Sequence, residues 1–305
     1  MTRVAYLGPQ GTFTEVALRQ LAAAGAVPGA PDVQLLPCDS AAAAIEVVRT
    51  GDADYACVPI ENSIDGTVLP TLDALAAGEP VRIYAEHTLE VAFTIVLRAG
   101  VSASEVRTVA AFPVAAAQVR RWLAVNLPQA AVVPAISNAG AAEAVSRGIA
   151  DAGISTALAA ANWGLDVMAD GVVDEPNART RFVLVGPIGA PPPRTGADRT
   201  SVVLALRNEP GALVGAMTEF AIRGIDLTRI ESRPTRTELG TYIFFLDCVG
   251  HIDDGPVAEA LMALRRRCAQ LRYLGSWPTG RAVGALPPNS DEAHQWLSSL
   301  RDGRK

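Results

Sequence analysis

Thr180 and Arg181 place a hydroxyl and a guanidinium next to each other, after a Gly-Val-Val-Asp-Glu-Pro turn and before a run of apolar residues. Arg179 adds a second guanidinium to the same short segment. Arginine pairs with carboxylates through parallel hydrogen bonds, and a threonine hydroxyl can donate one more. The segment therefore predicts a binding site for a small molecule that carries a carboxylate. A salt bridge from Arg181 to Asp174 or Glu175 explains that arginine equally well.

Two polar turns upstream strengthen this interpretation. The turn Gly8–Glu15 lies between the apolar run Val4–Leu7 and a stretch with helical spacing. Its glycines allow close backbone approach, and the helix start offers unpaired N–H groups, although a tight turn without a ligand fits as well. The second turn, Pro59–Val68, follows the apolar strand Asp54–Val58. Ligands of open α/β sheets bind at such carboxyl ends of strands, so this loop favours a site.

Composition bounds the class of protein. With 305 residues, half of them apolar, the chain is long enough for two domains with sizeable cores. No apolar run of about 18 residues predicts a membrane span, and the N-terminus reads as a first strand, so a soluble cytoplasmic protein is expected. The four cysteines show no Cys-x-x-Cys spacing and the three histidines are scattered. We therefore expect reduced thiols, no metal and no cofactor.

The charge excludes a nucleic-acid surface. The net charge is −6, and residues 1–186 carry 11 basic against 19 acidic side chains. Because bulk charge opposes an anion there, binding has to come from local donors such as backbone N–H groups, hydroxyls and a few arginines.

Residues 1–186 alternate strand and helix patterns, which predicts a mostly parallel sheet in each of two lobes. Lobe 1 takes in about residues 1–80 and 175–186, and lobe 2 about 81–174. Two connections, near 80–90 and 172–182, predict a hinge with a ligand cleft between the lobes.

Three local features of this region are also predicted. Asn138 and Ser155 are expected to cap two Ala-rich helices. Leu89–Leu97 is expected to form one strand. Pro113 fits the first turn of a helix that carries Gln118.

The C-terminal part reads as a second domain. Residues 187–199 form a Pro- and Gly-rich linker. Residues 200–278 follow the order βαββαβ, which is the ferredoxin-like unit. Residues 279–305 form a tail in which Asp291–Leu300 predicts a short helix.

These motifs resemble those of prephenate dehydratases. The turn Gly8–Thr14, the loop Ile60–Thr67 and Thr180-Arg181-Phe182 stand in the order and spacing of that family. Further on, Gly211-Ala212-Leu213 matches the Gly-Ala-Leu motif of its ACT regulatory domain, and Glu231-Ser232-Arg233-Pro234 the Glu-Ser-Arg-Pro motif. Five motifs in order, over about residues 1–280, make the resemblance specific.

One departure is visible. Many relatives carry Ser-His-Pro where this chain has Ala111-Phe112-Pro113, while Gln118 keeps its place. A catalytic role for that serine or histidine cannot be essential if this chain is active.

The resemblance implies an α/β fold, with a two-lobed catalytic domain like a periplasmic binding protein and a ferredoxin-like ACT domain. It implies a carbon–oxygen lyase of phenylalanine biosynthesis that converts prephenate to phenylpyruvate, and regulation by phenylalanine bound where two ACT domains meet. The expected assembly is a homodimer or homotetramer. An arogenate dehydratase and a non-catalytic amino-acid sensor remain alternatives, although a sensor has no need of the Thr-Arg-Phe motif.

The resemblance points to Thr180 as the catalytic threonine of the Thr-Arg-Phe motif, and the chemistry of the other side chains suggests their roles. The catalytic candidates are Thr180, Arg181 and Glu61. Thr180 is a poor general acid and is expected to donate a hydrogen bond to the departing hydroxyl. Glu61 is an acid if burial raises its pKa, or else a carboxylate bound to its own loop. The substrate-binding candidates are Thr12, Asn62, Ser63, Gly66, Thr67, Gln118, Ser155 and Phe182. The phenylalanine-binding candidates are Gly211, Ala212, Leu213, Glu231, Ser232, Arg233 and Pro234.

Overall fold

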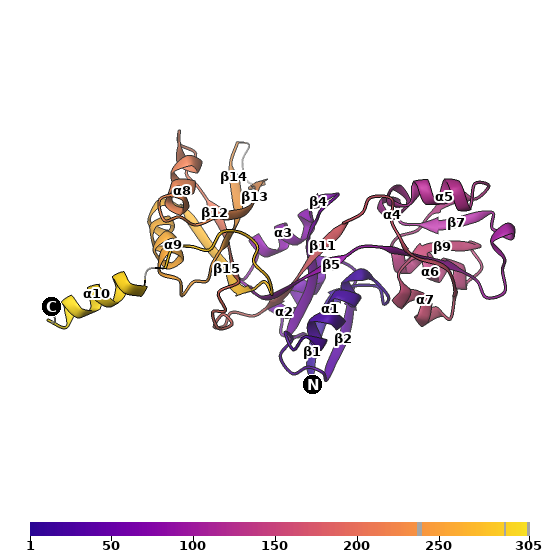
Figure 1. Cartoon of the computed structure of the whole chain (residues 1–305), viewed down its shortest axis with the longest axis horizontal. Helices are drawn as coiled ribbons and strands as arrows, with labels where there is room; N and C mark the ends of the chain where they lie inside the picture. The colour runs from indigo at the N-terminus through magenta and orange to yellow at the C-terminus, as the bar shows by residue number, and fades with distance from the viewer. Residues whose placement is uncertain (237–239, 290, 304–305) are drawn as a thin grey trace. The chain divides into compact units, whose positions relative to one another are not determined.

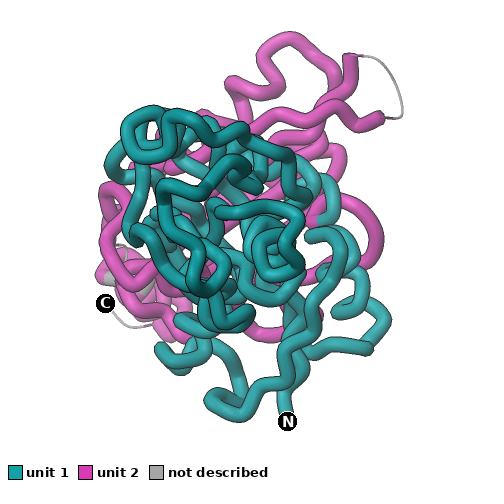
Figure 2. The backbone as a smooth tube through the Cα atoms, turned by 90° about the vertical axis from the view of Figure 1, so that its right-hand side faces the viewer, with its two compact units in different colours: residues 1–74, 87–184 teal, residues 75–86, 185–305 magenta. Residues whose placement is uncertain are grey.

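The computed structural model describes residues 1–236, 240–289 and 291–303, apart from the side chains of Asp291 and His294. The backbone divides into two compact units (Figure 2). The first comprises Met1–Ala74 and His87–Leu184, and the second comprises Leu75–Glu86 and Val185–Lys305. None of the described helices is both long enough and apolar enough to cross a bilayer.

Lobe 1 is built on the sheet with strand order β2-β1-β3-β11-β5, with β4 paired to β3. This sheet includes β5, which lies beyond the lobe boundary predicted near residue 80. Strand β1 is parallel to both β2 and β3, as the alternating pattern predicts. Ser40 caps α2, because its side chain accepts from the Ala43 N–H. The elements are β1 Thr2–Leu7, α1 Phe13–Ala23, β2 Val33–Cys38, α2 Ala41–Arg49, β3 Tyr55–Asn62, β4 Gly66–Thr67, α3 Leu69–Ala76, β5 Arg82–Glu90 and β11 Arg179–Gly186.

Lobe 2 has the strand order β10-β6-β9-β7-β8. The prediction of a mostly parallel sheet is wrong here, because β6 runs antiparallel to both β9 and β10 while β7 is parallel to β8 and β9. The elements are β6 Phe93–Leu97, the 3-10 helix η1 Ala103–Glu105, β7 Thr108–Ala111, α4 Pro113–Gln118, α5 Arg120–Asn126, β8 Ala131–Pro134, α6 Asn138–Ser146, β9 Ala152–Ser155, α7 Ala157–Trp163 and β10 Asp166–Val172.

Helices cover both faces of the lobe 2 sheet (Figure 1). Helices α4 and α5 pack one face, where Ala115 and Leu123 join a core with Val109 and Ile154. Helices α6 and α7 pack the other face through small alanine side chains. The lobe is therefore a three-layer α/β/α structure whose sheet positions the starts of four helices.

Several local predictions need correction. The helix caps are Ser137 and Thr156, one residue away from the expected Asn138 and Ser155. Each cap hydroxyl accepts a hydrogen bond from the third N–H of its helix. A neighbouring residue with a hydroxyl or amide side chain can form the same hydrogen bond, so the sequence does not show which of the two residues is the cap. The expected strand Leu89–Leu97 is interrupted, since β5 ends at Glu90 and β6 begins at Phe93.

The second unit contains the predicted βαββαβ order. Its sheet has the order β13-β14-β12-β15, and both helices pack one face through Phe220, Val257 and Leu264. The elements are β12 Asp198–Ala205, α8 Ala212–Ala221, β13 Leu227–Pro234, β14 Tyr242–Val249, α9 Gly255–Arg267, β15 Gln270–Pro278 and α10 Asp291–Arg301. The ferredoxin-like prediction is confirmed.

Residues 75–86 pack within the second unit. The Arg272 guanidinium donates to the carbonyls of Leu75, Ala77 and Gly78 at 3.0, 3.0 and 2.9 Å. These carbonyls lie at the C-terminal end of α3, where a cation satisfies unpaired acceptors and complements the helix dipole. Strand β15 is thus tied to residues 75–78 of the same unit.

A chain of buried ionic contacts crosses the second unit's sheet. Arg229 donates to both carboxylate oxygens of Asp247 at 2.9 and 3.0 Å. Arg199 lies 3.5 Å from Asp247 and 3.5 Å from Glu86, which also accepts from the Trp277 indole at 2.9 Å. Because the five side chains come from β13, β14, β12, β5 and β15, the network fixes these strands against one another.

Asp247→Asn should lower the free energy of unfolding by about 3–5 kcal/mol, since it leaves two buried guanidiniums without their shared charge. Urea denaturation of the full chain measures this loss. Glu259→Gln is the matched control, because that carboxylate is 52% exposed and 3.6 Å from Arg223. Equal stability of the two variants would contradict a structural role for the network.

Candidate functional site

A cavity of about 470 Å³, here called the Thr180 cavity, lies between the two lobes of the first unit. Thr180 and Phe182 line it from β11, and Phe13 and Phe93 lie edge to face at 5.6 Å on its apolar side. Its polar lining consists of Thr14, Asn62, Asp65, Thr67, Gln118, Asn138 and Thr180. The structure therefore brings together five of the residues predicted for substrate binding (Asn62, Gly66, Thr67, Gln118 and Phe182) and one predicted catalytic residue, Thr180.

The Thr180 hydroxyl is held in one orientation. Its Oγ1 accepts a hydrogen bond of 2.9 Å from the Asn62 amide. The Asn62 carbonyl oxygen accepts from the N–H groups of Ile64 and Asp65 at 2.8 and 3.0 Å, which fixes the amide in turn. Because Oγ1 already accepts from Asn62, its own proton is left for an acceptor in the cavity.

Arg181 and Glu61 are paired with each other, away from the Thr180 cavity. Neighbouring residues of a strand point to opposite faces, so Thr180 and Asn62 face the cavity while Arg181 and Glu61 do not line it. The two charges lie 3.0 Å apart, and Arg181 is only 6% exposed. The predicted alternative for Arg181 was a bridge to Asp174 or Glu175, but the Arg121 guanidinium lies 3.7 and 2.6 Å from those carboxylates.

The turn between β3 and β4 is joined to the start of β11. The Ser63 N–H donates to the Arg179 carbonyl at 2.8 Å, and the Ser63 hydroxyl accepts from the Arg179 N–H at 2.9 Å. The predicted loop is thus a hairpin, in which Glu61 pairs with Thr67 and Asn62 with Gly66. Ser63 holds strands together here and is not among the residues that line the cavity.

A larger cavity of about 990 Å³, here called the Thr12 cavity, adjoins the first and shares Phe13, Thr14, Phe112 and Asn138 with it. Thr12 lines it and caps α1, with its hydroxyl accepting from the Glu15 N–H at 3.4 Å. The turn touches lobe 2 at Gly11, whose carbonyl accepts from the Thr156 hydroxyl at 2.6 Å. A Cβ at Gly11 would lie 2.8 Å from that of Ala159, so this contact explains the glycine.

The buried Glu15 carboxylate organises the Gly8–Thr14 turn. It accepts from the Gly11 N–H at 2.7 Å, the Tyr6 hydroxyl at 3.2 Å and the Arg19 guanidinium at 2.9 and 2.7 Å. Burial, and then the Glu15 charge, raise the pKa of Tyr6, so the phenol stays a donor at any physiological pH.

Lobe 2 contributes two side-chain amides to the Thr180 cavity. Gln118 is 7% exposed at the end of α4, and Asn138 is the first residue of α6. Sequence reasoning took Asn138 for a cap, and its position in the lining of the cavity is visible only in the folded chain. Ser155 is fully buried and donates to the Asn138 carbonyl at 2.6 Å, so it supports α6.

The predicted regulatory residues lie in the second unit. Gly211 has a φ of 78° and caps α8, so Ala212 and Leu213 form its first turn. Glu231, Ser232, Arg233 and Pro234 end the strand β13, which is an edge of its sheet.

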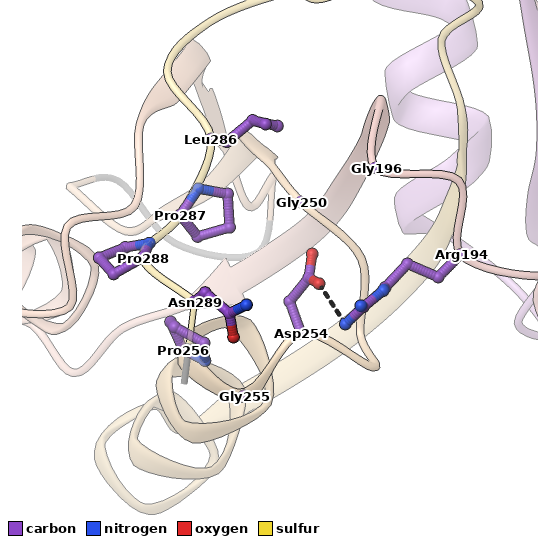
Figure 3. A pocket seen from close by; sticks show the side chains of 10 residues that line it. All are labelled: Arg194, Gly196, Gly250, Asp254, Gly255, Pro256, Leu286, Pro287, Pro288 and Asn289. Atoms are coloured by element: carbon purple, nitrogen blue, oxygen red, sulfur yellow. Dashed lines mark hydrogen bonds and ion pairs between the residues drawn. The ribbon is translucent and has the colours of Figure 1, made fainter. Parts of the chain in front are cut away.

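A small cavity of about 140 Å³ lies at the start of α9 (Figure 3). Arg194 lines it and donates to Asp254 at 3.0 Å, so its charge is already paired. The tail residues Leu286–Asn289 form the opposite side. The tail thus packs on the second unit, and nearby the Ala285 N–H donates to Asp226 at 3.0 Å.

Comparison with known proteins agrees with this architecture. A family model described as prephenate dehydratase matches residues 4–188, and one described as ACT domain matches residues 200–266. The prephenate dehydratase of Mycolicibacterium smegmatis is 70% identical and aligns over 99% of each chain.

Two solved structures are similar over nearly the whole chain. A prephenate dehydratase of Arthrobacter aurescens in complex with L-Phe is 42% identical, with a TM-score of 0.89 and coverage of 99% of this chain and 100% of its own. GqqA, described as a novel type of quorum quenching acylase, is 30% identical, with a TM-score of 0.80 and coverage of 91% and 98%. The fold alone therefore does not determine an activity.

Glu15→Gln should lower the free energy of unfolding by about 1.5–3 kcal/mol, because the turn loses hydrogen bonds to a buried charge. Urea denaturation followed by circular dichroism measures the effect. Glu175→Gln is the matched control, since Glu175 and its partner Arg121 are 65% and 62% exposed. A Glu15 variant as stable as this control would show that the carboxylate does not organise the turn.

Proposed function

The chain belongs to the prephenate dehydratase family, and from this membership we propose that residues 1–186 convert prephenate to phenylpyruvate in phenylalanine biosynthesis. The observation that carries the proposal is Thr180, whose hydroxyl is oriented by Asn62 at 2.9 Å in a cavity between two lobes. The activity is that of a carbon–oxygen lyase. Residues 187–199 act as a linker and residues 200–278 as the ACT regulatory domain.

The reaction needs few protein groups. The ring carboxylate leaves as carbon dioxide, and its bonding electrons enter the ring as the opposite carbon–oxygen bond breaks. The departing hydroxide takes up one proton and leaves as water. Aromatisation supplies the driving force, so the protein has to orient the substrate, exclude water and stabilise the leaving hydroxyl. Thr180 donates its hydrogen bond to that hydroxyl.

We assign Arg181 and Glu61 a positioning role in the reaction. Their 3.0 Å ion pair joins β11 to β3 next to the Thr180–Asn62 hydrogen bond. Two neighbouring links between the same strands restrict the sliding that would misplace Thr180. A direct contact of Arg181 with substrate would require the guanidinium to leave Glu61.

Regulation is proposed to act through the second unit. Gly211–Leu213 at the start of α8 and Glu231–Pro234 on the edge strand β13 form the proposed phenylalanine site. An edge strand can pair with a second copy of the chain, which supports a homodimer or homotetramer with the effector between two ACT domains. The four free cysteines support the cytoplasm as the compartment, since it keeps thiols reduced.

Arogenate dehydratase and amino-acid sensor are the alternatives. Arogenate carries an amino group where prephenate carries a keto group, and the reacting ring is the same. A sensor carries out no chemical step that would need the Thr180 hydroxyl, so the orientation of this hydroxyl by Asn62 favours an enzyme.

Thr180→Ala should lower kcat by roughly 10²–10³, the effect of removing one preorganised donor. Initial rates of phenylpyruvate formation measure it. Thr241→Ala, in the second unit, is a control for the loss of a threonine elsewhere and should keep its kcat. Near-normal turnover of the Thr180 variant would remove Thr180 from this role.

The purified full chain should form phenylpyruvate from prephenate, and phenylalanine should change the rate. The product is followed by its absorbance in base, with and without phenylalanine. A rate indifferent to phenylalanine would contradict the regulatory assignment only. Reaction with arogenate but not with prephenate would identify the protein as an arogenate dehydratase. Reaction with neither compound would favour the amino-acid sensor.

A further inference from the structure

Two amide oxygens, on residues that line the Thr180 cavity, are buried and lack a hydrogen-bond partner. They are Gln118 Oε1 and Asn138 Oδ1, and no described residue satisfies either. Leaving such a group unpaired in the interior is costly, so an unpaired amide that lines a cavity indicates a position where a ligand completes the hydrogen bonding.

The third amide of the cavity differs from these two. Asn62 donates to Thr180 and accepts from Ile64 and Asp65, so both ends of its amide are engaged within the protein. Asn62 therefore positions Thr180. The amide oxygens of Gln118 and Asn138, by contrast, have no partner among the described residues.

Asn138 occupies the junction of the two cavities, because it lines both. The Thr12 cavity is also lined by the first turns of α1 and α6, which come from different lobes. The cap hydroxyls of Thr12 and Ser137 engage the N–H groups of Glu15 and Gly140. The earlier N–H groups of each helix have no partner within the helix, and they carry the positive end of its dipole.

The charges at the cavities make neutral donors necessary. No lysine or arginine is among the described residues that line either cavity, whereas Asp39, Asp65 and Glu143 are. A substrate with two carboxylates has to be held here by amides, hydroxyls and backbone N–H groups.

We propose that Asn138 binds a carboxylate of the substrate through its side-chain amide, facing the first turn of α1. The NH₂ group of this amide is the hydrogen-bond donor, because the amide oxygen can only accept. Ser155 holds the Asn138 backbone carbonyl at 2.6 Å and so fixes the start of α6. This inference rests on the proposed dehydratase function.

The test compares two substitutions in the full chain with prephenate as substrate. Asn138→Ala removes the donor and should lower kcat/KM by about 10- to 100-fold, mainly through KM, as expected for a hydrogen bond to a charged group. Asn138→Asp keeps the size and an acceptor but adds a negative charge beside the carboxylate. It should lower kcat/KM at least tenfold further than alanine does.

Controls separate this inference from the function on which it rests. Asn126→Ala removes an exposed asparagine whose amide donates to the Trp122 carbonyl, and it should keep the wild-type kcat/KM. Thermal unfolding of each variant checks folding. Wild-type protein without activity on prephenate would overturn the proposed function. Active wild type with an equally active Asn138→Ala variant would overturn the inference alone, as would an Asn138→Asp variant more active than Asn138→Ala.

Discussion

The hydrogen bond between Asn62 and Thr180 joins residues that are 118 positions apart in the sequence, and the proposed active arrangement depends on it. It exists because β3 and β11 lie next to each other in the lobe 1 sheet, although the whole of lobe 2 is inserted between them. The Ser63–Arg179 bonds and the Arg181–Glu61 pair reinforce the same junction. The same strand pairing thus brings the chain back from lobe 2 and orients the Thr180 hydroxyl.

The second unit is organised by charge in its interior. Arg229 precedes Glu231 on the edge strand β13 and is tied through Asp247 and Arg199 to Glu86 of β5. Strand β5 continues beyond Glu86 into the first unit, and the end of α3 is held by Arg272. A displacement of β13 against β14 has to stretch bidentate bonds in a low-dielectric environment, which is costly. The strand that carries the proposed effector motif is therefore tied to residues 75–86 within the second unit.

The sequence predicts the elements better than the contacts between them. Strand and helix periodicity located β1, α1, β3 and the βαββαβ unit, because burial imposes periods of two and 3.6 residues on local sequence. It did not show that β6 is antiparallel, since direction depends on the path of the chain outside the strand. The exact caps were missed because Ser137 and Thr156 stand beside Asn138 and Ser155, which offer the same chemistry. The local sequence does not show that Asn138 lines a cavity or that Glu61 pairs with Arg181, because both depend on the tertiary structure.

The absence of a cation among the described lining residues suits the proposed chemistry. A guanidinium held against the ring carboxylate would stabilise the reactant, in which the charge sits on that group, more than the transition state, in which the charge moves into the ring. Only interactions that are stronger in the transition state accelerate the reaction. Arg181 faces away and is neutralised by Glu61 at 3.0 Å, while amides, a hydroxyl and helix starts face the cavity. In the proposed reaction, neutral donors would hold the substrate without opposing the loss of carbon dioxide, and this is a physical reason for the Thr-Arg-Phe motif to place its arginine outside the cavity lining.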